Sequence, residues 1–461
     1  NVLVFLACFD KWDYSNFEYY SRIENNGNPR LKFEKLKKYV IVRCDTNTDS
    51  YSIIDIAKKC LLNADSEITG IITEQAFDYL HKELKKEIEE KTSINMQKVD
   101  EMYLTAIKLG KYILLNNPCF AEKYYKWFIK FEQSLTPKML YELKGTSIEK
   151  FMEATEDYLS KSFKDDIHSN CKLQIYYDYA WTFCYRRQYE EAYEHITKYE
   201  KLAKNICVDK NDERIVKAKY TKAVILQNQG EYEQSLKLHN EVLEIRKTES
   251  NDKLKGISYN CIALLYMLMN DFGNAQFNFD KSLEYRSKEK DLIGFCTAHA
   301  NISKMYFLKA VFTGNTEYLA CAEKELDIAL DNLPETKYSA LYKSWKIRYT
   351  IINAQKLRFK NDTVVKDYIC LIDELKEFYG LVINNPQYGM HNHLMTTENN
   401  IAVMLALMGD VSALQKFKKC LASKEVFYNA DSNKKCKPYL IAKQNLRFYE
   451  DGNFSNLLFE Y

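Results

Sequence analysis

The stretch YTKAVILQNQGEYEQSLKLHNEVLEI (220–245) decides the fold of this 461-residue chain. Apolar residues recur at steps of three and four on both sides of Gly230, which indicates two amphipathic helices joined by a short turn. The first helix carries the small residue Ala223 and, three residues later, Leu226. Antiparallel helices approach closely only where side chains are small, so we expect the second helix to cross the first at Ser235.

The same pattern recurs along more than half of the chain, roughly over residues 171–425. It is found in YYDYAWTFCYRRQYEEAYEHITKYEKLA (176–203), YNCIALLYMLMNDFGNAQFNFDKSLEY (259–285), HANISKMYFLKAVFTGNTEYLACAEKELDIALDNLP (299–334) and, more degenerate, NNIAVMLALMGDVSALQKFKKCL (399–421). The small crossing residues Ala192, Ser235, Ala275 and Ala322 are 43, 40 and 47 residues apart. The sequence therefore resembles the tetratricopeptide repeat, whose period is about 34 residues. We expect longer helices or linkers here, and an insertion at 312–318 within the fourth unit.

This resemblance implies an all-α fold, a TPR-like solenoid of helix-turn-helix repeats. The scarcity of Gly (13) and Pro (6) agrees with it, because hairpins and sandwiches need many turn residues. The stretches 339–362 and 364–385 also predict a helix pair, although they lack the repeat pattern. We expect a solenoid over 171–425 and a helical C-terminal cap over 426–461.

Residues 1–65 follow a different pattern. Helices are predicted over 2–9, 14–23 and 31–39, then a strand-turn-strand around DTNTDS (45–50), then a helix ending at Leu62. The order of these predicted elements and the residues in them resemble the winged-helix domain of STAND-type signalling NTPases. That family's Tyr-x-Met-His-Asp-Leu matches residues 51–56, where Asp55 is kept and Ile54 replaces the histidine that touches nucleotide phosphate. Asp55 is thus a weak nucleotide-sensing candidate, and residues 70–165 are expected to form a helical linker or degenerate repeats.

Catalytic motifs are absent from the sequence, including the G-x-x-x-x-G-K-[ST] phosphate loop. We therefore expect no enzyme activity, cofactor or metal in this chain. The STAND resemblance implies an ATPase core that lies upstream of Asn1 or was removed. His391 and His393 could supply two metal ligands, but a zinc site needs three or four, so a polar loop after Pro386 is the preferred interpretation. Cys296 and His299 share a helical face, yet a buried packing cysteine is the expected state.

Charge and cysteine usage bear on partners and compartment. The chain has 66 Lys+Arg against 64 Asp+Glu, so it lacks the basic excess of a general nucleic-acid or membrane binder. Thirteen dispersed cysteines without a C-x-x-C pair fit a reducing compartment, and the sequence has no run of 18 uncharged apolar residues. We expect a cytoplasmic protein, and the opening residue Asn1 leads us to expect that the sequence begins inside a longer one.

Repeat geometry predicts where a ligand would bind, since the first helix of each unit lines the concave face in this repeat family. Aromatic and amide side chains at these positions suit a peptide or protein surface. The candidate groove residues are Gln174, Tyr177, Trp181, Lys217, Tyr220, Gln227, Asn260, Lys304, Phe307 and Asn399.

The leading interpretation is the sensing and regulatory region of a STAND-like signalling NTPase. The resemblance implies a protein or peptide trigger on the solenoid, self-oligomerisation on activation and a role in microbial defence. Two alternatives remain open: a free-standing repeat scaffold or adaptor, and a peptide-responsive transcription regulator. The acidic turn DTNTDS would meet phosphate unfavourably, which counts against DNA binding.

Overall fold

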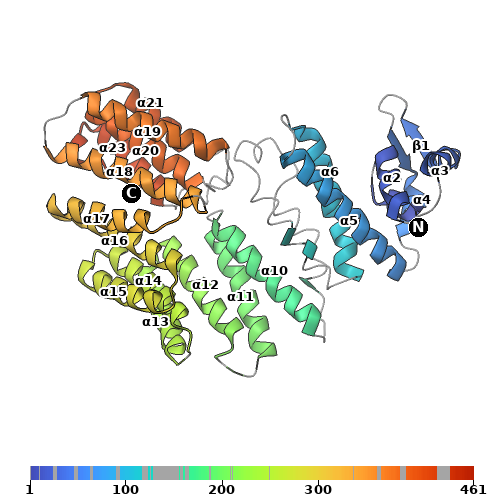
Figure 1. Cartoon of the computed structure of the whole chain (residues 1–461), viewed down its shortest axis with the longest axis horizontal. Helices are drawn as coiled ribbons and strands as arrows, with labels where there is room; N and C mark the ends of the chain where they lie inside the picture. The colour runs from blue at the N-terminus through green and yellow to red at the C-terminus, as the bar shows by residue number, and fades with distance from the viewer. Residues whose placement is uncertain are drawn as a thin grey trace. The chain divides into compact units, whose positions relative to one another are not determined.

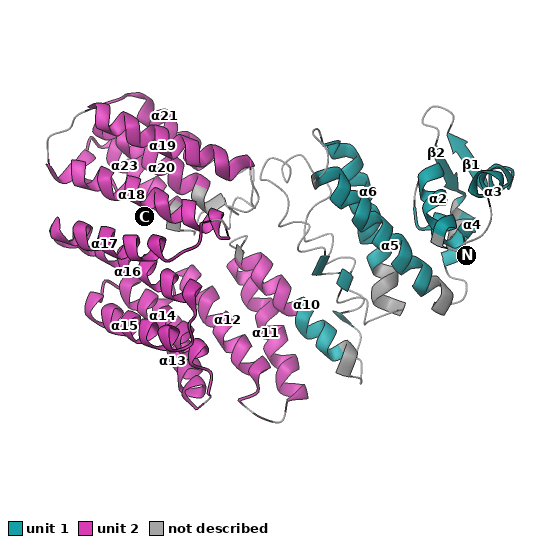
Figure 2. Ribbon diagram, viewed as in Figure 1, with its two compact units in different colours: residues 1–132, 139–175 teal, residues 133–138, 176–461 magenta. Residues whose placement is uncertain are grey.

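The chain folds into two compact units, which Figure 2 colours separately: residues 1–132 with 139–175, and residues 133–138 with 176–461. The computed structural model describes residues 2–9, 11–23, 28–45, 50–62, 66–89, 94–116, 123–124, 126–127, 155, 159–160, 166–185, 188–207, 209, 211–248, 250–335, 337–360, 365–384, 391–422 and 437–461.

The first unit begins with three short helices, a two-stranded antiparallel hairpin and a fourth helix. These elements are α1 (Val2–Ala7), α2 (Tyr14–Ile23), α3 (Pro29–Leu36), β1 (Val42–Asp45), β2 (Ser50–Ile53) and α4 (Asp55–Leu62). In the hairpin Val42 pairs with Ile53, and the residues Trp12 and Tyr51 exchange backbone hydrogen bonds of 2.8 and 2.7 Å. The Trp12 and Tyr51 rings stack at 5.2 Å, so aromatic packing fixes the hairpin against the helices.

Two long helices follow in this unit, α5 (Ser66–Glu89) and α6 (Met96–Asn116), and they pack against each other. Ala76 and Phe77 of α5 and Tyr103 and Ala106 of α6 are fully buried. Small residues beside large ones let the two helices approach closely.

The second unit is a TPR-like α-solenoid, which confirms the fold class predicted from the sequence. Its helices pack in sequence order, each against the next (Figure 1). They are α10 (Asp166–Tyr185), whose first half belongs to the first unit, α11 (Tyr189–Ile206), α12 (Glu213–Gln229), α13 (Tyr232–Lys247), α14 (Asp252–Leu268), α15 (Phe272–Lys288), α16 (Leu292–Thr313), α17 (Glu317–Asp331), α18 (Ser339–Lys360), α19 (Val365–Asn384), α20 (His391–Leu407), α21 (Ser412–Ala422) and α23 (Lys437–Glu450).

The predicted crossing residues lie where the helices of each pair meet. Ala192, Ser235, Ala275 and Ala322 each have 0% of their surface exposed. The Ser235 hydroxyl donates to the Ala223 carbonyl oxygen at 2.6 Å, so its polar atom is satisfied at the crossing. Small side chains at these four positions are thus what lets each hairpin close.

Short turns reverse the chain between paired helices. Gly230, with φ of 90°, ends α12, and Asn270, 40 residues later with φ of 63°, follows the end of α14. Glycine and asparagine are the residues that adopt this left-handed conformation most readily. Asp271 then caps α15 by accepting the Asn274 backbone N–H at 3.1 Å, so α15 begins directly after the turn.

Two local expectations are wrong. Residues 312–318 form no insertion, because α16 continues to Thr313 and α17 begins at Glu317. Residues 391–393 do not form a polar loop, since α20 begins at His391. In the fourth unit the additional residues lengthen the first helix, since α16 has 22 residues where α14 has 17.

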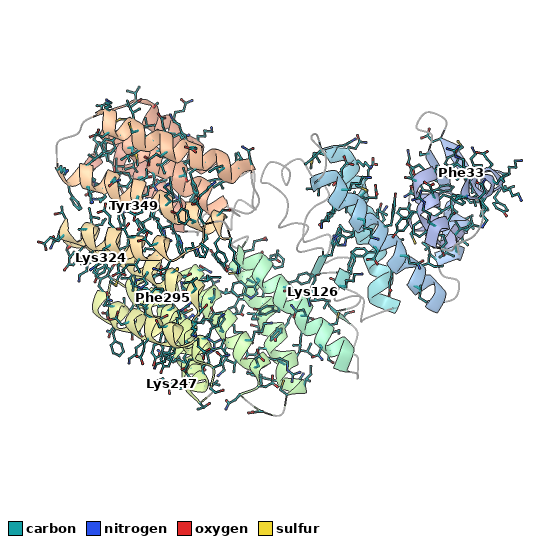
Figure 3. The ribbon with its side chains drawn as sticks, viewed as in Figure 1. Phe33, Lys126, Lys247, Phe295, Lys324 and Tyr349 are labelled. Atoms are coloured by element: carbon teal, nitrogen blue, oxygen red, sulfur yellow. The ribbon has the colours of Figure 1, made fainter. Side chains whose placement is uncertain are left out.

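Side chains fill the space within and between the helix pairs (Figure 3). Tyr349 of α18 donates its hydroxyl to Asp327 of α17, and Phe295 of α16 packs edge-to-face on His299 with ring centroids 4.5 Å apart. The Tyr349–Asp327 hydrogen bond therefore joins α17 to the helix that follows it, whereas the Phe295–His299 contact lies within α16.

Candidate functional site

An extended stretch of the chain, residues 457–461, lies against the helices of the solenoid's C-terminal half. It follows α23 and the short 3-10 helix η2 (Phe454–Asn456). Its hydrogen bonds reach α16, α18, α20 and α23. Figure 1 accordingly marks the end of the chain among α16, α17 and α18. We call the surface on which these five residues lie the tail groove.

Two asparagine side chains hold the backbone of this stretch. Asn445 accepts the Leu458 N–H at 2.8 Å and donates to the Leu458 carbonyl at 2.8 Å. Asn400 does the same for Glu460, with both distances 2.7 Å. A primary amide can pair with the N–H and C=O of one extended residue because it carries both a donor and an acceptor.

A third asparagine, Asn399, reinforces the contacts at Leu458. It accepts a hydrogen bond from Asn445 at 2.9 Å and donates to the Leu458 carbonyl at 3.4 Å. The side chains of Asn399, Asn400 and Asn445 are all essentially fully buried. Buried amides are costly unless they are hydrogen-bonded, and residues 458 and 460 supply these partners.

The alternate residues of the stretch insert their side chains between the helices. Leu457 and Phe459 belong to the same buried apolar core as residues of α16, α18 and α20. This alternation is the ordinary geometry of extended chain, in which successive side chains point to opposite sides. The groove therefore contacts the backbone of positions 458 and 460 and the side chains of positions 457, 459 and 461.

Tyr461 occupies the most specific of these positions. Its ring stacks on Phe307 with centroids 4.5 Å apart, and its hydroxyl shares a 2.5 Å hydrogen bond with Ser303. The Arg348 guanidinium lies 5.2 Å from the ring centroid and donates to the Ala300 carbonyl at 2.7 Å. Burial raises the pKa of the Tyr461 hydroxyl, so it stays protonated and able to donate.

A second arginine holds the entry to the groove. Arg358 of α18 donates to the carbonyl oxygens of Ser455 and Leu457. Burial lowers the pKa of Arg358, and a guanidinium removed from water needs hydrogen-bond acceptors in compensation. The two carbonyls provide them, which fixes where the extended stretch begins.

Three of the predicted groove residues form a separate cluster on α10 and α12. The Lys217 ammonium lies 3.6 Å from the centroid of the Tyr177 ring, and Trp181 packs edge-to-face on Tyr177 at 6.3 Å. All three side chains are half-buried. A cation–π contact and aromatic packing therefore bring these three side chains together.

The expected exposure of three other groove residues is wrong. Asn260 is buried and accepts a hydrogen bond from Asn301 of the next unit at 3.1 Å. Phe307 and Asn399 have 1% and 0% of their surface exposed. The reason is that residues 457–461 cover Phe307 and Asn399, and a neighbouring helix covers Asn260.

The remaining candidates are dispersed. Tyr220 packs on His239, with ring centroids 5.5 Å apart, and beside Arg246 at 5.1 Å, while Gln227 and Lys304 are half-buried on α12 and α16. Gln174 belongs to the first unit. Asp55 begins α4, and its side chain lies outside the described residues, as do those of His391 and His393.

Several residues of the tail groove were not found from the sequence: Ser303, Arg348, Arg358, Asn400 and Asn445. One signal could have found the asparagines. In NNIAVMLAL (399–407) two adjacent amides begin an otherwise apolar helix face, and buried amides require partners. The arginines give no such signal, because the chain has 66 Lys and Arg residues and nothing in the local sequence distinguishes Arg348 or Arg358 from the others.

The structure also bears on the Cys296 and His299 pair, on metal binding and on membrane-spanning helices. Cys296 is fully buried, which raises the pKa of its thiol, and His299 pairs with Glu325 at 2.6 Å. The described part contains no group of three or more His, Cys, Asp or Glu residues arranged to hold a metal ion. No helix within it has the length and apolar character needed to cross a membrane.

Comparison with known proteins gives similar structures only. No protein-family model and no curated protein matches the chain. A Rap protein complexed with Competence and Sporulation Factor is 11% identical, with 86% of this chain and 100% of that chain covered and a TM-score of 0.46. The apo form of the quorum sensor NprR from B. thuringiensis is 13% identical, with 78% and 96% covered and a TM-score of 0.42.

A STAND protein with a tetratricopeptide repeat sensor from Pyrococcus horikoshii is also similar. It is 12% identical, with a TM-score of 0.36, and 92% of this chain is covered. The chain spans 62% of that protein's length. At these identities and TM-scores no function is transferred from the three structures to this chain.

Proposed function

We propose that the solenoid is a receptor for an extended segment of a partner protein or peptide. One observation carries this proposal: buried asparagines of the tail groove pair with the backbone of an extended stretch, and alternate side chains enter the core. Backbone pairing gives affinity for extended polypeptide, and pockets for alternate side chains give specificity. In this proposal the protein binds a polypeptide and catalyses no reaction. It uses no cofactor and acts in the cytoplasm.

The wider proposal is that this receptor is the sensing region of a STAND-like signalling protein with a microbial-defence role. The order of elements α1 to α4, with the hairpin packed on Trp12, supports a winged-helix domain before the solenoid. Ile54 in place of the family's histidine means that nucleotide contact would come from elsewhere. A nucleotide-binding module encoded upstream of Asn1 would support this part, and an initiation codon there would contradict it.

A free peptide with the sequence FSNLLFEY (454–461) tests the receptor. The chain used is the Glu460→Pro variant, because proline removes the N–H that Asn400 accepts and loosens the chain's own stretch. Fluorescence anisotropy of the labelled peptide should show saturable 1:1 binding. Adding Asn400→Ala should weaken this binding at least tenfold, since it removes two hydrogen bonds worth about 1 kcal/mol each.

The matched control is Asn353→Ala, which removes an exposed asparagine of α18. It should leave peptide affinity unchanged, and the thermal unfolding of each variant should be recorded alongside. The proposed receptor function would be refuted if the peptide did not bind a folded Glu460→Pro chain. It would also be refuted if adding Asn400→Ala left the peptide affinity of that chain unchanged.

A further inference from the structure

We propose that residues 457–461 are an internal ligand of the tail groove, displaced by an external segment that repeats their pattern. That segment carries an apolar residue, a Phe and a Tyr at alternate positions of extended chain. This inference rests on the proposed function and adds to it the class of partner and the means of regulation.

The first argument is that the groove recognises features any peptide of this pattern possesses. Within the extended stretch, Asn445 and Asn400 contact backbone atoms of residues 458 and 460 and no side chain. Arg358 likewise binds the carbonyl oxygens of Ser455 and Leu457. None of these contacts depends on the covalent connection to α23, so a free segment can make every one of them.

The second argument concerns specificity at the last position. Ser303 lies 40 residues after Ala263, which itself lies 40 residues after Ala223, so the third and second units carry alanine where the fourth carries serine. The Ser303 hydroxyl is fully buried within α16 and bonds the Tyr461 hydroxyl. A phenylalanine at this position of a ligand would leave the serine without that partner, so the groove favours tyrosine.

The third argument is competition. A segment tethered by a short connection has an effective concentration in the millimolar range, which an external ligand must overcome. The affinity measured for an external peptide is then reduced by the fraction of molecules whose groove is empty. The chain's own stretch thereby sets a threshold that only a matching ligand, or one at high concentration, exceeds.

The test compares the unaltered full chain with the Glu460→Pro variant, using labelled FSNLLFEY as the probe. The variant should bind the peptide at least tenfold more tightly, because its own stretch competes less well. Asn456→Ala, at an exposed residue of η2, is the matched control and should bind like the unaltered chain. If Glu460→Pro does not fold, Tyr461→Ala loosens the stretch without altering the asparagines.

The outcomes separate the two proposals. Equal, Asn400-dependent binding by the unaltered chain and the variant would overturn the internal ligand and leave the receptor standing. No binding to either folded chain would overturn the receptor itself. A peptide ending in Phe should bind at least fivefold more weakly than one ending in Tyr, and Ser303→Ala should abolish that difference. Equal binding of the two peptides to the unaltered Ser303 chain would contradict the stated specificity.

Discussion

His239 is a buried histidine whose two ring nitrogens have no hydrogen-bond partner among the described residues. Burial, with a smaller effect from Arg246, lowers its pKa to about 4, against 6.5 in an exposed chain. As pH falls below about 6.5, the unfolded chain therefore binds a proton before the folded chain does. The free energy of unfolding should fall by about 1.4 kcal/mol per pH unit from this residue down to about pH 4.

Replacing His239 with phenylalanine should remove this acid sensitivity. Phenylalanine is the residue at the equivalent position of the next unit, Phe279, four residues after the crossing residue in both. Urea unfolding at pH 7.5 and pH 5 should differ less in His239→Phe than in the unaltered chain. The comparison is of pH dependence, since the new ring also changes packing. An unchanged difference between the two pH values would contradict the assignment.

His195 is expected to contribute in the same direction. Burial, together with a smaller effect from Lys198 and against the opposing charge of Glu194, lowers its pKa to about 4. Its ring stacks on Phe183 with centroids 5.4 Å apart, and its Nδ1 atom has no hydrogen-bond partner in the described part of the chain. The residual acid sensitivity of the His239→Phe variant should therefore be reduced again by His195→Phe.

At the scale of the helix pair, α17 offers two alanines with opposite surroundings. Ala322 is fully buried at the crossing with α16, whereas Ala320 is exposed. Ala322→Leu should lower the free energy of unfolding by about 1–3 kcal/mol, because the crossing has no room for a larger side chain. Ala320→Leu should change it by less than about 0.5 kcal/mol.

Both substitutions have almost the same intrinsic helix propensity cost. The difference in free energy of unfolding between the two variants therefore measures the cost of a larger side chain at the helix crossing. Denaturant unfolding followed by circular dichroism measures it. Equal stability of the two variants would mean that the helices of the fourth unit do not depend on a small residue at Ala322.

The helix pairs were predictable because their signals are local. A small residue at Ala192 or Ala275 lies within about 20 residues of the partner helix it allows to approach, so periodicity and spacing reveal it. The repeat period also placed Tyr177 and Lys217 on first helices of adjacent units, but it did not predict that they contact each other. In contrast, Asn260 was misplaced because spacing does not reveal how closely the next unit covers the first helix.

At the scale of the whole chain, the tail groove could not be predicted from the sequence. Ser303 and Tyr461 are 158 residues apart, and no periodic pattern links them. Phe307 and Asn399 were expected to face a ligand, and they do face extended polypeptide, but it is the chain's own. The groove's binding chemistry was therefore partly anticipated, whereas its occupant was not.

Residues 457–461 contact helices of several successive pairs, α16, α18, α20 and α23. In a repeat array each unit contacts its neighbours, so the loss of contacts in one unit should leave distant units unchanged. Tyr461 contacts Phe307 of α16 and Arg348 of α18. Tyr461→Ala should therefore speed amide hydrogen exchange at least tenfold in slowly exchanging segments of α16, α18 and α20, and leave α11, α12 and α13 unchanged.

Hydrogen-exchange mass spectrometry of full-length Tyr461→Ala, with Asn456→Ala as control, tests this expectation. The local pattern follows because opening one end of a solenoid need not unfold the other. Equal acceleration in α11–α13 would show that the second unit opens as a single cooperative body. Unchanged exchange throughout would mean that the Tyr461 side chain contributes nothing to holding α16, α18 and α20 together.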